Sequence, residues 1–231
     1  MIQISNLTKK YGETVVFSDL NYTFENACIY GLVGRNGAGK TTLLNILSNY
    51  DKNYTGVISI DRKKMNKVDY LDMPVAYAMD QPSFFNELTI YENLLLIASS
   101  RKIKKQEAFD KSERILDGLG LKKYENYSPL ELSKGTMQRL NNACAMIQEE
   151  KITIFDEPFS GLDPVQMKLL ENVMVEFHKK EKGIYIISSH DIECLQNVCD
   201  KCLLLHNGQI REINTEEVDR EKIAKILSEG E

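Results

Sequence analysis

The chain has 231 residues, of which 42% are hydrophobic and 27% are charged. This composition allows a sizeable core and is not that of a disordered chain. The formal net charge of -5 argues against a broad basic surface, so we expect no nucleic-acid partner. A small anionic ligand is still compatible with an acidic chain, because it needs only a few well-placed N–H groups.

Hydropathy and cysteine usage favour a cytoplasmic protein. The longest apolar run, Leu94–Ala98, is far shorter than the roughly 20 residues that span a bilayer. The N-terminus lacks the basic start and long apolar stretch of a signal peptide. The five cysteines, an odd number, fit reduced thiols better than a disulfide framework. Cys199 and Cys202 form a CxxC, but no second CxxC accompanies it, so ordinary thiols are favoured over a metal site.

The first third of the chain reads mainly as β-structure. Alternating or continuous apolar patterns predict strands, which cover residues 2–7, 15–26, 28–34, 56–61 and 75–80. A helical spacing follows the Gly-rich segment at residues 40–50. Between residues 82 and 133 the pattern changes to long helical periods, at 88–100 and 104–120, with no strand between them.

Strands and helices alternate again in the last third. The pattern predicts strands at 151–158 and 183–190, helices at 164–180 and 191–199, and a hairpin at 202–213. The charged tail, residues 215–231, reads as an amphipathic helix that caps the fold. The succession implies an α/β core with a mainly parallel sheet, helices on both faces, and a helical insertion.

A glycine-rich segment, "GRNGAGKTT" from Gly34 to Thr42, matches the pattern GxxxxGK[ST] between a predicted strand and a predicted helix. The glycines let the backbone N–H groups wrap a phosphate. Lys40 can reach the β and γ phosphates, and the Thr41 hydroxyl can bind Mg²⁺. The strand before it and the helix after it favour this interpretation over a chance Gly-rich loop.

Two carboxylates and a histidine lie at the ends of predicted strands. Asp156 and Glu157 follow "ITIF", and their diverging side chains can act separately, one near Mg²⁺ and one near a water. A loop-edge acidic pair would be the ordinary alternative. His190 ends another predicted strand, at the edge where parallel α/β sheets bind ligands. His178 and His206, in a Lys-rich helix and at a hairpin, are expected to be structural.

A second small polar turn, "LSKGT" from Leu132 to Thr136, opens a predicted helix. Free backbone N–H groups and the positive end of a helix dipole suit an anion.

The order of these motifs strongly resembles the nucleotide-binding domains of ABC transporters, over nearly the whole chain. Tyr11 in "KKYGE" looks like the family's adenine-stacking aromatic residue, and Gln81 in "AMDQPSFF" like its Q-loop glutamine. "GRNGAGKTT" is similar to its Walker A motif, and "ITIFDEP" to its Walker B motif. "SGLD", residues 160–163, is similar to its D-loop, and His190 to its switch histidine.

The polar turn at "LSKGT" resembles the family's signature, normally LSGGQ. Ser133 and Gly135 match, whereas Lys134 replaces a glycine and Thr136 replaces a glutamine. We expect function to survive, because the retained hydroxyl and N–H are the groups that touch phosphate. Two roles for Lys134 stay open: its side chain adds charge near the nucleotide, or it faces solvent.

The resemblance implies a P-loop NTPase (RecA-like) core of residues 1–81 and 136–231, with an N-terminal antiparallel β portion and a helical subdomain at 82–135. It implies ATP and Mg²⁺ as cofactors and catalytic roles for Glu157, His190, Lys40 and Gln81. It places the metal at Thr41, Gln81 and Asp156. It implies nucleotide contacts from Tyr11, Gly34, Asn36, Gly37, Ala38, Gly39, Lys40, Thr41, Thr42, Ser133, Gly135 and Asp163.

The implied function is that of an ATP-hydrolysing subunit that works peripherally on the cytoplasmic side of the cell membrane. Its expected partners are a second copy or a homologous subunit, which together sandwich ATP, and a separate multi-span permease. "FFNELTIYENLLLIA" and "SKGTMQRL" favour export of drugs, peptides or antibiotics over import.

Two other functions fit the motifs less well. One is a soluble ABC ATPase of translation, DNA repair or iron–sulfur assembly. Such translation factors carry two of these domains and such repair proteins carry long insertions, so the short chain argues against both. The other is a regulatory protein that binds nucleotide without turnover, against which the joint presence of Glu157 and His190 speaks.

Overall fold

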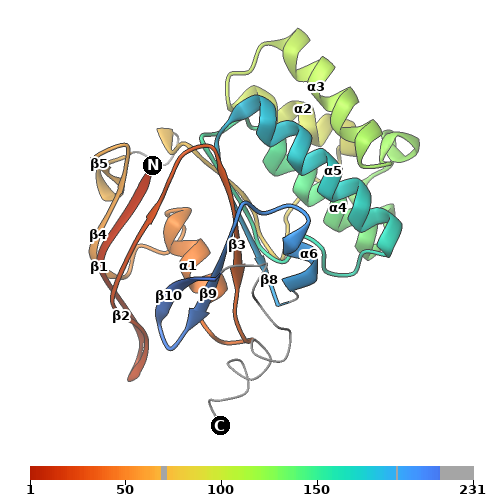
Figure 1. The fold of residues 1–231 in the computed structure, drawn as a ribbon. Coiled ribbons are helices and arrows are strands. Elements are labelled where there is room, and N and C mark those ends of the chain that lie inside the picture. Colours follow the sequence, from red (N-terminus) through yellow and green to blue (C-terminus); the bar gives the residue numbers. More distant parts are fainter. Residues whose placement is uncertain (69–71, 191, 214–231) are drawn as a thin grey trace. The chain divides into compact units, whose positions relative to one another are not determined.

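The structure is a computed structural model that describes residues 1–68, 72–190 and 192–213. It contains two compact units, shown in Figure 1. The first consists of Met1–Pro74 and the chain from Ile184 onward, and the second is Val75–Gly183.

The first unit contains an antiparallel sheet in the order β2-β1-β4-β5. The strands are β1 (Ile2–Tyr11), β2 (Thr14–Phe24), β4 (Thr55–Ile60) and β5 (Lys63–Lys64), followed by the 3-10 helix η1 (Met65–Lys67). Strand β1 buries one face, with Ile2, Ile4 and Leu7 in the core. This sheet confirms the N-terminal antiparallel β portion.

The other described strands of the first unit are mainly parallel. Strand β3 (Cys28–Val33) pairs in parallel with β8 (Ile184–Ser189) and with β9 (Lys201–His206), which pairs antiparallel with β10 (Gln209–Ile213). All six residues of β3 and of β8 are buried, as expected of strands with packing on both faces. The described residues of this unit also form the helices α1 (Lys40–Leu47) and α6 (Ile192–Gln196).

The second unit is mainly helical. Its parallel strands β6 (Val75–Ala78) and β7 (Ile152–Phe155) pair with each other, and helix α4 packs on both. Helices α2, α3 and α4 pack against one another, and α5 packs on α3, as Figure 1 shows in green and teal. The helices are α2 (Ile90–Ser100), α3 (Lys105–Gly118), α4 (Lys134–Met146) and α5 (Pro164–Glu181), with 3-10 helices η3 (Lys122–Tyr124) and η4 (Pro129–Glu131).

Local sequence explains where these helices begin. Thr89 and Glu92 form a capping box at the start of α2, and Asp163 caps α5 ahead of Pro164. The strands and helices predicted from sequence periodicity are confirmed, but several end earlier than expected: α1 ends at Leu47 rather than at residue 50, β7 at Phe155 rather than at 158, and α6 at Gln196 rather than at 199. The predicted tail helix lies outside the described residues.

Candidate functional site

The glycine-rich loop of the first unit connects β3 to α1. Gly37 and Gly39 have φ values of 83° and 100°, in the left-handed region that favours glycine. A Cβ atom on Gly39 would also lie 2.8 Å from Cγ1 of Val16, and one on Gly34 would lie 2.8 Å from the Leu205 carbonyl oxygen. The loop therefore needs glycine both for its backbone conformation and for its close packing.

Helix α1 begins as an open cradle for an anion. Gly39, which precedes its first residue, has no side chain to cap the helix, and no acidic residue lies in the first turn. The N–H groups of a first turn have no partner within the helix. Lys40 is 6% exposed, and its ammonium group donates to the Gly34 carbonyl at 2.7 Å, so the side chain folds back over the loop. A phosphate chain fits this arrangement of N–H groups and charge.

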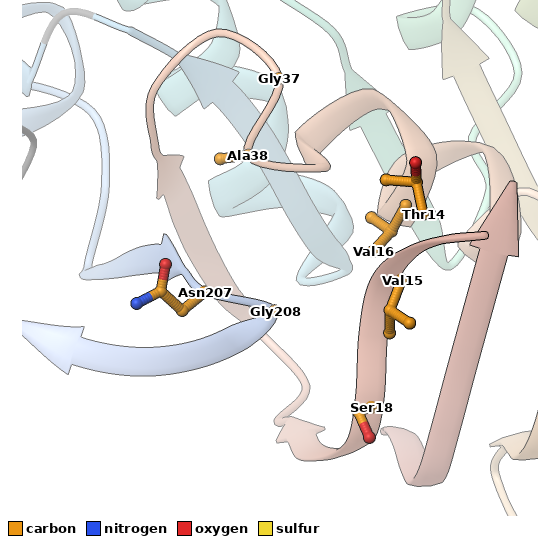
Figure 2. Close-up of a pocket in the computed structure, with 8 residues that line it drawn as sticks. All are labelled: Thr14, Val15, Val16, Ser18, Gly37, Ala38, Asn207 and Gly208. Atoms are coloured by element: carbon orange, nitrogen blue, oxygen red, sulfur yellow. The ribbon is translucent and has the colours of Figure 1, made fainter. Parts of the chain in front are cut away.

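A cavity of about 370 Å³ lies beside the loop. Figure 2 shows its walls, which come from three segments: β2, the glycine-rich loop, and the turn between β9 and β10. The lining residues are Thr14, Val15, Val16, Ser18, Gly37, Ala38, Asn207 and Gly208. Only Gly37 and Ala38 were expected from the sequence. The Asn-Gly turn was missed, although its strand β9 runs parallel to β3 and ends at the same edge as the loop.

The register of the parallel strands brings His190 to the same edge. Val33 pairs with Ser189, so Gly34 and His190 are the next residues on two neighbouring strands. The side chain of His190 is exposed. Tyr11 lies at the end of β1 next to Thr14 of β2, is 52% exposed, and donates its hydroxyl hydrogen bond to Asp51 at 3.2 Å.

The carboxylate pair lies in the second unit, at the end of β7. Asp156 is 1% exposed, its N–H donates to the Ala78 carbonyl, and it accepts a hydrogen bond from the Tyr77 hydroxyl at 3.4 Å. Glu157 is half-buried and has a φ of 48°, a left-handed conformation that is uncommon for glutamate. The two neighbouring carboxylates thus differ in burial, and the backbone leaves the extended conformation at Glu157.

Gln81 follows the neighbouring strand of the same unit. Ala78 of β6 pairs with Phe155 of β7, so the chain continues towards Gln81 and Asp156 from adjacent strand ends. Gln81 itself is exposed.

The turn at "LSKGT" begins α4 as expected, with Ser133 as its N-cap. The Ser133 hydroxyl accepts from the Thr136 N–H at 3.3 Å and lies 2.9 Å from the Thr136 hydroxyl. Thr136 is 3% exposed and also accepts a hydrogen bond from Arg139 at 3.3 Å. The hydroxyl of Thr136 therefore binds within its own helix.

The same turn packs on the "SGLD" segment. A Cβ atom on Gly135 would lie 2.9 Å from the Gly161 carbonyl oxygen and 3.1 Å from Oε1 of Gln166. In contrast, the stem of Lys134 lies along Gly161, with the nearest carbon at 3.8 Å from the position of a Cβ on that glycine. Gly135 is thus sterically required, whereas position 134 has room for a side chain. Asp163 accepts from the Gln166 N–H at 2.9 Å as the cap of α5.

A family profile described as ABC transporter matches residues 17–160, which is more than half of the chain. The chain belongs to the ABC transporter family of ATP-binding proteins.

The comparisons with individual proteins agree with the family match. The ABC protein described here is 31% identical to the bacitracin transport ATP-binding protein BcrA of Enterococcus faecalis, over 95% of this chain and 71% of that protein. It is 29% identical to the tungstate uptake system ATP-binding protein TupC of Peptoclostridium acidaminophilum, over 91% of this chain and 97% of that protein. A solved ATP-binding subunit of an ABC transporter superposes with a TM-score of 0.86 at 26% identity, over 98% of this chain and 97% of that one.

These matches settle the class of the protein. It is an ATPase with the P-loop fold of ABC cassettes, and its cofactor is ATP, with Mg²⁺ as the usual partner. In the part of the chain that the structure describes, no helix has both the length and the apolar character needed to cross a bilayer.

The cysteines of this ABC protein are all free thiols. Burial raises the pKa of Cys144 to about 12 and that of Cys202 to about 11, which keeps both thiols protonated at neutral pH. Within residues 1–68, 72–190 and 192–213, no group of three or more His, Cys, Asp or Glu side chains is placed to hold a metal ion.

Proposed function

We propose that this ABC ATPase powers transport by a separate multi-span permease, from the cytoplasmic side of the cell membrane, and that it acts in export. The observation that carries the catalytic part is the turn after β7. There a buried Asp156 is followed by Glu157 in a left-handed conformation, and this difference in burial and backbone supports different tasks for two neighbouring carboxylates.

We assign these roles from the motifs that the chain shares with its family. Lys40 contacts the β and γ phosphates, and His190 contacts the γ-phosphate. Thr41, Asp156 and Gln81 hold Mg²⁺, which neutralises phosphate charge when it is bound. Glu157 accepts the hydrogen bond of the attacking water and polarises it.

The nucleotide contacts complete this assignment. Tyr11 stacks on the adenine ring, and backbone N–H groups of the glycine-rich loop bind the phosphates. This set consists of Gly34, Asn36, Gly37, Ala38, Gly39, Thr41 and Thr42. Ser133, Gly135 and Asp163 contact the nucleotide of a second copy.

The catalytic assignment is tested by Glu157→Gln. This substitution removes the charge and keeps the shape, so ATP turnover should fall by roughly 10²–10⁴-fold, the range for a positioned general base, while ATP binding survives. Glu107→Gln, an exposed residue in the first turn of α3, serves as the matched control and should hydrolyse ATP normally. A Glu157→Gln variant with wild-type turnover would remove Glu157 from this role.

We also propose that two copies sandwich ATP, with the Ser133–Thr136 turn of one facing the γ-phosphate bound by the other. The test mixes Lys40→Ala with Ser133→Arg. If the turn acts across the dimer, a mixed dimer has one intact site, so ATPase activity or trapping of one labelled nucleotide per dimer should return. Mixed dimers that show neither signal would overturn this arrangement.

The permease contact is assigned to the segment after Gln81, which begins the proposed helical subdomain at residues 82–135. Phe84, Phe85 and Leu88 would form the apolar floor that receives the permease. Phe85 is 58% exposed, and the buried amide of Asn93 bonds to both its N–H and its carbonyl at 3.0 Å. A rigid loop that presents an exposed aromatic ring supports a docking role.

Phe85→Glu should therefore weaken permease binding and leave the ATPase activity of the isolated chain unchanged. Phe109→Glu is the matched control, because Phe109 on α3 is 48% exposed and lies outside this loop. Binding is measured by co-purification from detergent-solubilised membranes. Equal loss of binding and ATPase activity would mean that Phe85 supports the fold of the ATPase and not docking, and a protein found only in the soluble fraction would contradict the transport proposal.

The direction of transport needs a separate test, since the relatives named above include both a bacitracin transport protein and a tungstate uptake protein. Export predicts that deletion of the gene makes cells more sensitive to a drug or peptide antibiotic. A growth requirement for an external nutrient, with unchanged sensitivity, would show import instead.

A further inference from the structure

Lys9 is a buried lysine in β1 to which the catalytic assignment gives no role. Its side chain is 1% exposed. A buried ammonium group is costly unless it is paired, and this one has three contacts. It lies 2.6 Å from Oδ2 of Asp51, donates to the Asn53 carbonyl at 2.8 Å, and lies 4.4 Å from the ring centroid of Tyr11.

Asp51 forms a second link between Lys9 and Tyr11, because it contacts both side chains. Its Oδ2 accepts from the Tyr11 hydroxyl at 3.2 Å, and its Oδ1 accepts from the Asn53 N–H at 2.9 Å. Burial by itself raises the pKa of the Asp51 carboxyl, but the hydrogen bonds from Lys9, Asn53 and Tyr11 lower it below its ordinary value. Asp51 is therefore ionised at neutral pH and holds the phenol end of the ring.

Lys9 and Asp51 form a brace that holds the Tyr11 ring. This brace is bonded to the helix that starts at the glycine-rich loop. Helix α1 ends at Leu47, and the N–H groups of Tyr50 and Asp51 both donate to the Asn45 carbonyl at 2.9 Å. The helix thus begins at Lys40 in the phosphate cradle, and the segment bonded to its last turn fixes Tyr11. At 1.5 Å per residue, this helix of eight residues is roughly 12 Å long.

The position of Lys9 leaves one face of the Tyr11 ring open. Tyr11 is 52% exposed, yet the ammonium over one of its faces belongs to a buried side chain. Since Lys9 lies over one face, we infer that the exposed area lies on the opposite face and the ring edge. A cation on one face also draws π-electron density towards itself, which makes the other face less negative and more favourable for stacking with an electron-rich purine.

We propose that Lys9 is a positioning residue for the nucleoside: it holds the Tyr11 ring, together with Asp51, so that the open face receives the base. The inference rests on the stacking role proposed above for Tyr11. Lys9 touches no nucleotide atom, and its effect passes through the ring.

The test separates the base from the phosphates by comparing ATP with inorganic tripolyphosphate. Dissociation constants are measured by calorimetry without Mg²⁺, so that no turnover occurs, for wild type, Lys9→Met, Tyr11→Ala and the double variant. Lys9→Met should weaken ATP binding by about 3- to 10-fold, as expected for loss of a largely desolvated cation–π contact, and leave tripolyphosphate binding unchanged. In the Tyr11→Ala background it should have no further effect.

Three further variants guard against a folding defect. Lys10→Met changes the exposed neighbouring lysine and should bind as wild type. Lys9→Arg keeps the cation and should retain most of the ATP affinity. Lys9→Met combined with Asp51→Asn removes the uncompensated carboxylate and should show the same loss of ATP affinity as Lys9→Met, with thermal unfolding near that of wild type.

The outcomes distinguish a failure of the role of Lys9 from a failure of the proposed stacking role of Tyr11. If Tyr11→Ala leaves the ratio of ATP to tripolyphosphate affinity unchanged, the stacking role itself fails. If Tyr11→Ala lowers the ratio and Lys9→Met does not, only the role of Lys9 is overturned. Loss of both ligands in Lys9→Met with Asp51→Asn, or an additive loss in the Lys9→Met, Tyr11→Ala variant, would also overturn it.

Discussion

The helices α1 and α4 begin in opposite ways, although both first turns lack an acidic residue. Gly39 offers α1 no side-chain cap, whereas the Ser133 hydroxyl accepts a hydrogen bond from the third residue of α4. An N-cap serine is worth roughly 0.5–2 kcal/mol to a helix. The first turn of α1 therefore lacks the side-chain hydrogen bond that α4 receives from its own chain.

The difference in capping fits different proposed roles for the two turns in binding phosphate. The α1 cradle has a wrapped loop, a folded-back lysine and a first turn without a side-chain cap within one unit, which supports its proposed role as a phosphate site. The α4 turn is already capped and presents a single polar edge. Such an edge suits a ligand that is held elsewhere and brought to it, as the proposed dimer requires.

Among the substitutions that compare the two helix starts, the largest effect is expected at the glycine-rich loop before α1. Lys40→Met removes the ammonium group that lies over the loop, so ATP turnover should fall by about 10²–10³-fold, comparable to loss of one charge-stabilising donor. ATP affinity should fall with it. Lys64→Met, at an exposed position in β5, is the control. Turnover and calorimetry measure the effect, and normal turnover in Lys40→Met would break the distinction between the two helices.

An intermediate effect is expected from the glycine of the capped turn. Gly135→Ala places a Cβ atom against the Gly161 carbonyl, so the turn must shift and ATP turnover should fall by roughly 10–100-fold. ATP affinity of the single chain should stay unchanged, because the cradle lies in the other unit. Lys134→Ala is the control and should keep its turnover. Equal turnover in Gly135→Ala and wild type would contradict the steric requirement.

The smallest effect concerns the hydroxyl that Thr136 adds to the turn. Thr136→Val keeps the shape but removes the partner of Ser133 and of the buried Arg139, which should lower the free energy of unfolding by about 1–2 kcal/mol. Thr136→Ser should retain most of the stability. Urea unfolding of both variants measures the difference, and a Val variant as stable as wild type would show that the hydroxyl adds nothing to the cap.

Periodicity was sufficient to predict the elements, because each strand or helix has a local pattern. The six buried residues of β3 and the capping residues of α2 and α5 are examples of signals contained in a few neighbouring residues. Helix α6 was predicted too long for the same reason. Its spacing continues beyond Gln196, but the N–H groups of Val198 and Cys199 both donate to the Leu195 carbonyl and close the chain into a turn.

The sequence by itself determined the phosphate loop and the order of the motifs, since glycine spacing, Lys40 and the strand ends are local features that need no distant partner to be recognised. Only the tertiary structure decided which residues surround them. The wall formed by Asn207 and the brace between Lys9 and Asp51 join segments that are far apart in the chain. No periodicity encodes such pairs, because burial of a charged side chain depends on the partner that folding brings to it.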